Sequence, residues 1–163
     1  MVVLAFSLAA CSSGAKDDSS KKEDTKTSTS SSKEKVLNYY MDVVSQISDK
    51  NADFSAFQQA QSADPKPTDA ELSELAKKGT VSAQAVSDML KDEKVPDLGK
   101  STDKFKTAIS DLSAAYGQEA EALKAAKPDT AAADEALQKA ADEIAKILKD
   151  NGLAGSDILT DTM

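Results

Sequence analysis

Two charged side chains, Lys50 and Glu119, occupy equivalent places in two apolar patterns of the sequence. The first pattern is formed by positions 36, 40, 43, 47, 50, 54 and 57, and the second by positions 105, 109, 112, 116, 119, 123 and 126. Steps of four and three residues keep each set on one face of a helix. If the two helices are parallel and diagonal in a bundle, both charges reach the interior at one level. A buried Lys50–Glu119 ion pair would then fix the register or line a ligand cavity.

A small rotation of the two helices gives the alternative arrangement. It brings Asn51 and either Ala120 or Ala122 inward and leaves both charges in solvent. The distance between the Lys50 nitrogen and the Glu119 oxygens separates the two hypotheses.

Two other groups of side chains, one aromatic and one acidic, are candidates for a binding or catalytic site. An aromatic site for a glycan or peptide could form from Tyr39, Tyr40 and Tyr116, but tyrosine on a helix stripe more often packs in the core with its hydroxyl at the rim. Acidic residues are paired at Glu119/Glu121, Asp134/Glu135 and Asp142/Glu143. Adjacent helical residues point about 100° apart, and no segment resembles a calcium loop. We therefore expect solvated faces rather than a glycosidase acid and base or a calcium site.

The composition excludes many active sites. The 163 residues contain no histidine, no tryptophan, no arginine and a single cysteine, so histidine-based relays, disulfides and thiolate zinc sites are missing. The net charge of −8 and the lack of arginine argue against nucleic acid as a partner. We expect no enzyme activity, no cofactor and no metal.

The positions above require long helices, and the sequence from about residue 33 predicts four of them. The predicted spans are 33–61, 68–94, 101–127 and 129–151. Within each span apolar residues recur at helical spacing. The segment Asp64-Pro65-Lys66-Pro67 ends the first helix, and Thr68 with Glu71 forms a capping box that begins the second. The sequence Asn151-Gly152-Leu153 predicts a Schellman stop. Gly79 weakens the middle of the second helix by about 1 kcal/mol and would permit a break or bend there.

Helices of this length joined by short links favour an all-α, antiparallel up-down four-helix bundle over residues 33–153. A three-helix bundle with one loosely docked helix is the rival. The tail, residues 154–163, lacks periodicity, and we expect it either to drape over the bundle or to fray. Residues 12–32 contain no large apolar side chain, so residues 11–32 are predicted to be a disordered linker.

The N-terminal segment Met1 to Cys11 is apolar and ends in small residues before the only cysteine. Leu8-Ala9-Ala10-Cys11 resembles the lipobox of bacterial lipoproteins, and the polar linker resembles those of small Gram-positive surface lipoproteins. This resemblance implies that residues 1–10 are a signal peptide and that Cys11 carries acyl chains which hold the protein on the outer face of the cell membrane. The basic residues that open such signals are missing, which indicates a truncated signal or a start upstream of Met1.

These features together predict a non-catalytic, lipid-anchored extracytoplasmic protein. Its helical bundle would bind another protein or a component of the cell envelope. The alternative is a carrier or chaperone-like bundle that holds a small apolar ligand or an unfolded segment in a cleft between helices. A carrier predicts an apolar pocket of a few hundred Å³, whereas an interaction module predicts a filled core and an exposed apolar or alanine-rich patch.

Overall fold

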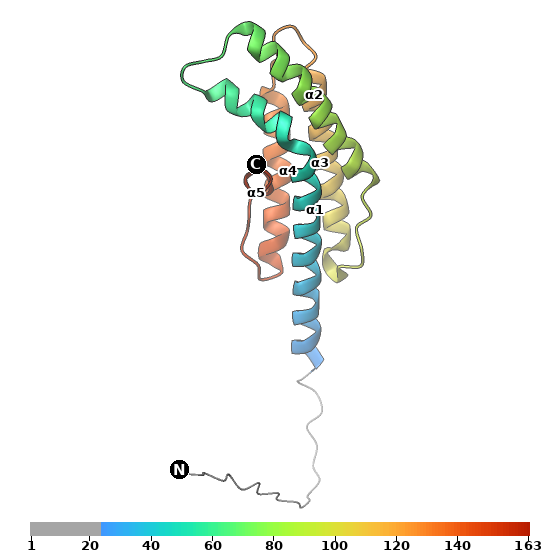
Figure 1. Ribbon diagram of the computed structural model, residues 1–163. Coiled ribbons are helices and arrows are strands. Elements are labelled where there is room, and N and C mark those ends of the chain that lie inside the picture. Colours follow the sequence, from blue (N-terminus) through green and yellow to red (C-terminus); the bar gives the residue numbers. More distant parts are fainter. Residues whose placement is uncertain (1–23) are drawn as a thin grey trace, which may run out of the picture.

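The computed structural model describes the backbone of residues 24–163 and the side chains from residue 32 onward. Every regular element in that part of the chain is a helix. The order is α1 (Asp24–Ser62), α2 (Asp69–Asp92), the short 3₁₀ helix η1 (Gly99–Ser101), α3 (Thr102–Ala122), α4 (Ala131–Asp150) and the one-turn α5 (Ile158–Asp161). The four long helices pack against one another with alternating direction (Figure 1), which confirms the predicted all-α bundle.

The N-terminal boundary of the helical region differs from the prediction. Helix α1 begins at Asp24, so residues 24–32, which were assigned to a disordered linker, are helical. No glycine or proline interrupts this stretch, and each residue added to an existing helix gains a backbone hydrogen bond without a new nucleation cost. Cys11 and the predicted signal peptide, residues 1–10, lie outside the described residues. Over the described range, no helix combines the length and the hydropathy needed to cross a membrane.

The helix ends follow the local signals closely. Thr68 accepts from the backbone N–H of Glu71, and the Glu71 carboxylate accepts from the N–H of Thr68, so the predicted capping box is formed. Gly152 has a φ of +72°, and Leu153 N–H donates to Leu148 O at 3.0 Å, which confirms the Schellman stop. Helix α3, however, ends at Ala122 instead of continuing to residue 127. Its chain leaves through tighter turns, in which Lys124 N–H donates to Glu121 O.

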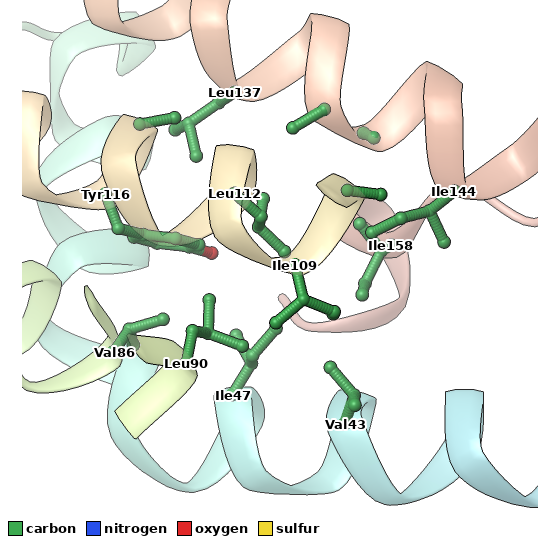
Figure 2. Close-up of a cluster of buried hydrophobic side chains, with 14 of the residues drawn as sticks. Val43, Ile47, Val86, Leu90, Ile109, Leu112, Tyr116, Leu137, Ile144 and Ile158 are labelled. Carbon is green, nitrogen blue, oxygen red and sulfur yellow. The ribbon is translucent and has the colours of Figure 1, made fainter. Parts of the chain in front are cut away.

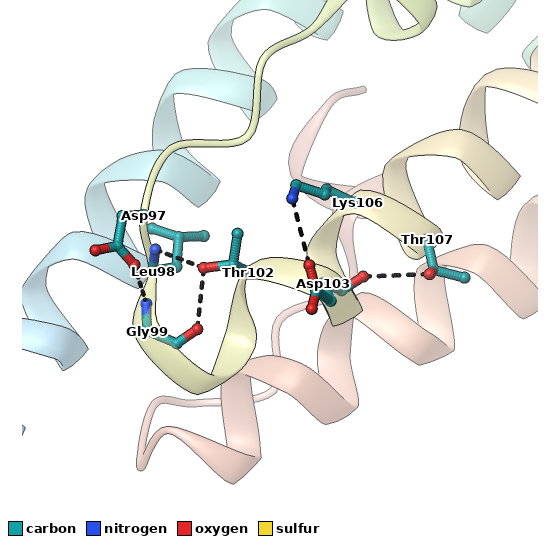
Figure 3. A network of polar contacts seen from close by, with 7 residues as sticks. All are labelled: Asp97, Leu98, Gly99, Thr102, Asp103, Lys106 and Thr107. Carbon is teal, nitrogen blue, oxygen red and sulfur yellow. Dashed lines mark hydrogen bonds and ion pairs between the residues drawn. The ribbon is translucent and has the colours of Figure 1, made fainter.

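A second turn positions the start of α3 (Figure 3). Gly99 has a φ of +64°, a left-handed conformation that side chains other than glycine rarely adopt. Its N–H donates to Asp97 Oδ1, and the Thr102 hydroxyl accepts from Leu98 N–H and donates to Gly99 O. These bonds satisfy polar groups at the point where the chain reverses from α2 into α3.

Gly79 does not break α2, contrary to one expectation. The helix is continuous from Asp69 to Asp92, and Gly79 is buried. A Cβ atom at this position would lie 3.3 Å from Leu123 Cδ1 and 3.4 Å from Phe57 Cβ. The glycine is therefore explained by the close approach of α2 to α1 and to the end of α3.

Helix α1 is bent, and a side chain of α2 accounts for the bend. Ser82 Oγ donates to Lys50 O and accepts from Phe54 N–H at 3.3 Å. These two backbone groups are the ones that would pair in an uninterrupted helix. A hydroxyl inserted into the ladder is a recognised cause of bending, and Figure 1 shows that the second half of α1 leans away from the bundle axis.

The core is continuous along the bundle, and all four long helices contribute to it (Figure 2). Its labelled members are Val43, Ile47, Val86, Leu90, Ile109, Leu112, Tyr116, Leu137, Ile144 and Ile158. Small polar residues of α2 and α3 are buried as well. The hydroxyls of Ser87 and Ser113 each donate to the other's backbone carbonyl at 2.8 Å, which ties the two helices together.

The C-terminal tail is part of the fold. Ile158 of α5 is 1% exposed and packs beside Ile144 and Ile109 in the core (Figure 2). The Tyr40 hydroxyl of α1 donates to Asp161 Oδ2 at 2.5 Å. The tail thus drapes over the bundle and links α4 to α1, which confirms the first of the two predictions for residues 154–163.

Candidate functional site

The predicted ion pair between Lys50 and Glu119 is wrong. Lys50 is exposed, whereas Glu119 is completely buried, and no ion pair joins the two side chains. On α1 the inward position next to Ile47 and Phe54 is taken by Asn51, which is 3% exposed and donates to Ser55 Oγ. The rotation alternative is therefore correct for α1. On α3 it is correct for Ala120, which is buried, and wrong for Glu119, which is buried as well instead of facing solvent.

Glu119 is a buried carboxyl group without a cationic partner. Neither of its oxygens has a hydrogen-bond partner in the described part of the chain. Burial, and after it the nearby Asp134 carboxyl group on α4, together raise the pKa of Glu119 to about 8. Asp134 itself is exposed and accepts a hydrogen bond from the Thr130 hydroxyl at 2.9 Å. Glu119 is consequently neutral at pH 7.

The tyrosines and the acidic pairs considered as candidate sites do not form one in the described part of the chain. All three tyrosines are buried, and Tyr39 stacks edge-on against Phe105 with ring centroids 5.3 Å apart. Glu121, Glu135 and Asp142 are exposed, as expected for solvated faces, and Glu143 is half-buried, so Glu119 is the one fully buried member of the three pairs. The described residues include no group of three or more histidine, cysteine or acidic side chains that could hold a metal ion.

A groove lies at one end of the bundle. Its volume is about 770 Å³, which is within the usual range of ligand sites. One wall is the end of α1, with Phe57 and Gln61; a second is the first half of α2, from Asp69 to Thr80; the third is the chain after α3, residues 123–128. The groove lies at the end opposite the one where α1 begins (Figure 1).

The floor of the groove is apolar and rigidly packed. Phe57, Ala76 and Leu123 line it, and all three also belong to the core. Leu72 is half-buried and completes the apolar surface. The bend in α1 carries Phe57 to this wall, and the absence of a side chain at Gly79 lets the floor close beneath it.

The rim of the groove carries charges of both signs. Three lysines, Lys77, Lys124 and Lys127, line it together with one carboxylate, Asp69. Lys77 pairs with Glu74 at 2.7 Å, and Lys124 pairs with Glu121. The three lysines are therefore balanced by three carboxylates, and the rim has no net positive charge.

Other surface features are smaller. Two depressions of about 240 and 260 Å³ lie beside α3. Leu37 and Met41 are 41% and 54% exposed and adjoin one another on α1, one turn apart. Two exposed apolar side chains are ordinary for a soluble surface.

Sequence reasoning missed this groove. Its walls come from three separate stretches of the chain, and only their packing brings Phe57, Ala76 and Leu123 together. The one local signal was Gly79, whose position on α2 marks the close approach beneath the floor. The dipeptide Lys127-Pro128, which also lines the groove, was interpreted only as the end of a helix.

Comparison of the chain with known protein families, with curated proteins and with solved structures finds no match to any of them.

Proposed function

We propose that this protein is a lipid-anchored, extracytoplasmic binding module without catalytic activity. In this proposal Cys11 carries the lipid, and the helical bundle offers its end groove to a macromolecular partner. The observation that carries the proposal is the groove of about 770 Å³, lined by α1, α2 and residues 123–128, at the end of the bundle remote from the start of α1.

The direction of α1 supports this assignment. The helix has 39 residues and therefore spans about 58 Å at 1.5 Å per residue. A membrane anchor at Cys11 precedes its first residue, Asp24, and the groove lies near its last turns. An anchored bundle would thus hold the groove away from the lipid headgroups, where a partner could reach it.

The side chains of the groove support binding rather than catalysis. Its polar members include Lys77, Asp69 and Ser73, with no base positioned to activate a nucleophile. Glu119, whose raised pKa would suit a general acid, is completely buried and does not line the groove.

The carrier function remains the second candidate because the floor of the groove is apolar. A carrier for a small apolar ligand would enclose it, since ligand pockets bury most of the ligand surface. This groove is partly open to solvent rather than enclosed, which favours a partner that keeps one face in solvent.

Acylation is tested by replacing Cys11 with alanine in cells that express the full chain. The wild-type protein should incorporate a labelled fatty acid and fractionate with the membrane. The C11A protein should do neither and should appear in the medium. Equal labelling of both proteins would refute the anchor.

Binding through the groove is tested by site-specific photo-crosslinking on intact cells. A photoreactive residue at Ser73, which lines the groove, should yield a discrete adduct of higher mass. The matched control is Gln138, an exposed polar position on α4 that does not line the groove. Equal adducts from both positions, or none from Ser73, would contradict the proposed function.

A further inference from the structure

We infer that the C-terminal tail, residues 154–163, is a strap that opens while the four long helices stay folded, and that its opening exposes an apolar seam between α1 and α4. The inference concerns a different part of the bundle from the end groove and does not depend on the proposed function. Its basis is the way in which the tail is attached, by a firm root at the end of α4, an inserted side chain and a hydrogen bond to α1.

The seam exists because the bundle is not closed between its first and last long helices. Helix α1 packs along α2, α2 along α3 and α3 along α4, whereas α1 and α4 share no comparable interface in the described part of the chain. Ile158 of the tail is 1% exposed and lies beside Ile109 and Ile144, and Val43 of α1 belongs to the same cluster (Figure 2). The tail therefore covers apolar side chains that the four long helices alone leave uncovered.

The root of the strap is fixed independently of the tail. Asn151 caps the end of α4, and its side-chain nitrogen donates to Ile147 O at 2.7 Å and to the Ser101 hydroxyl at 2.8 Å. Two glycines, Gly152 and Gly155, follow in a stretch that belongs to no helix. Glycine is free to change its backbone conformation, so the chain can swing beyond Asn151 while α4 keeps its end.

The backbone hydrogen bonds of the tail stay within the tail. Leu159 N–H donates to Asp157 Oδ1 at 3.0 Å, and Asp161 N–H donates to Asp157 O at 3.0 Å. The Thr162 hydroxyl donates to Ile158 O at 2.8 Å. Among the described residues, no backbone hydrogen bond joins the tail to a long helix, so its release breaks none.

Side chains hold the strap closed. Ile158 is the one member of the core cluster that the tail contributes. The Tyr40 hydroxyl of α1 donates to Asp161 Oδ2 at 2.5 Å, and Tyr116 of α3 lies near Thr162. Segments with few buried apolar contacts open at a lower cost than the whole protein. The tail is such a segment, because the rest of the core comes from the long helices and the turn before α3.

Hydrogen exchange of the full chain, followed by mass spectrometry, tests the opening. Amides of residues 159–163 should exchange at least about tenfold faster than those of residues 108–116 in α3. Val86→Ala, at a fully buried position of α2, should accelerate exchange in α3 at least about tenfold and change that of the tail by less than about twofold. The tail is spared because its exchange needs only local opening.

A matched pair of tyrosine variants tests what holds the strap. Tyr40→Phe removes the hydrogen bond to Asp161 and should accelerate exchange of the tail about tenfold. Tyr39→Phe makes the same chemical change at the preceding residue, where the buried hydroxyl has no hydrogen-bond partner in the described part of the chain. Exchange of the tail should therefore change by less than about twofold in the Tyr39→Phe protein.

Exposure of the seam is read from a thiol at Val43 in the C11A protein. Val43 is 1% exposed, so a cysteine there reacts only when the protein opens. The V43C thiol should react with a maleimide about tenfold faster in the Tyr40→Phe protein than in the Tyr39→Phe protein. Val86→Ala should leave its rate within about twofold, because the seam is uncovered without unfolding of the long helices.

Three results would overturn the inference. They are equal acceleration of the tail and α3 by Val86→Ala, equal effects of the two tyrosine substitutions on the tail, and a V43C thiol whose reaction is accelerated by Val86→Ala as much as α3 exchange is. Circular dichroism confirms that the variants remain helical.

Discussion

Replacing Glu119 with glutamine should make the protein more stable at neutral and alkaline pH. The wild-type carboxyl is completely buried, has no hydrogen-bond partner among the described residues and lies near the Asp134 carboxylate. Burial and this neighbour raise the pKa of Glu119 from its ordinary value of 4.5 to about 8. Glutamine keeps the shape of the side chain and cannot ionise.

The direction of the change in the free energy of unfolding with pH follows from the number of protons bound in the folded and unfolded states. Between pH 4.5 and pH 8 the unfolded chain has an ionised Glu119, while the native protein keeps the proton. Unfolding therefore releases a proton, and the free energy of unfolding falls by about 1.4 kcal/mol for each pH unit in this window. Over the whole window the wild-type protein loses up to about 5 kcal/mol, and the E119Q protein does not. The native state can relax by turning the carboxylate toward solvent beside exposed Asp134, so we expect roughly 2–4 kcal/mol.

The assay is urea unfolding followed by circular dichroism at several pH values from 5 to 8.5, with the free energy obtained by linear extrapolation. The matched control is Glu121→Gln on the same helix, because Glu121 is exposed and its change should stay within about 0.5 kcal/mol. Parallel pH profiles for the wild-type and E119Q proteins, or an E119Q protein less stable at pH 8, would refute the assignment of a buried neutral carboxyl.

Three further substitutions test the packing of the bundle, each by urea or thermal unfolding. Ser82→Ala removes the hydroxyl that bridges two backbone groups of α1 and should cost about 1–2 kcal/mol; an unchanged protein would show that the bridge is not needed. Gly79→Leu forces a side chain against Leu123 and Phe57 and should cost about 1–3 kcal/mol, whereas a neutral result would contradict the close approach. Ile158→Ala should cost about 2–4 kcal/mol because the side chain is buried, and a loss below 0.5 kcal/mol would mean that the tail frays.

The features that the sequence predicted well are those governed by neighbours in the chain. The Thr68–Glu71 capping box, the Gly152 stop and the apolar stripes depend on local geometry, so four helices in one bundle could be predicted. The rotation of each helix depends on its partners. On α1 the bend at Ser82 and the burial of Asn51 leave Lys50 in solvent, and nothing local to residue 50 indicates this.

The candidate site was harder to predict because it is formed by packing at a distance. The groove needs the bend in α1, the close approach at Gly79 and the early end of α3, and each depends on contacts between elements. The burial of Glu119 was considered only together with Lys50. Its environment depends on Asp134 of α4, a residue fifteen positions later in the chain whose role the local pattern does not reveal.

The central claim is that a partner binds in the end groove, and a photo-crosslinking scan over the exposed surface on intact cells tests it most directly. We predict that a photoreactive residue at the groove positions Ser73 and Lys127 yields the adduct, while Gln138 of α4 and the exposed pair Leu37 and Met41 yield none. Adducts centred on Leu37 and Met41, or equal at all five positions, would contradict the claim.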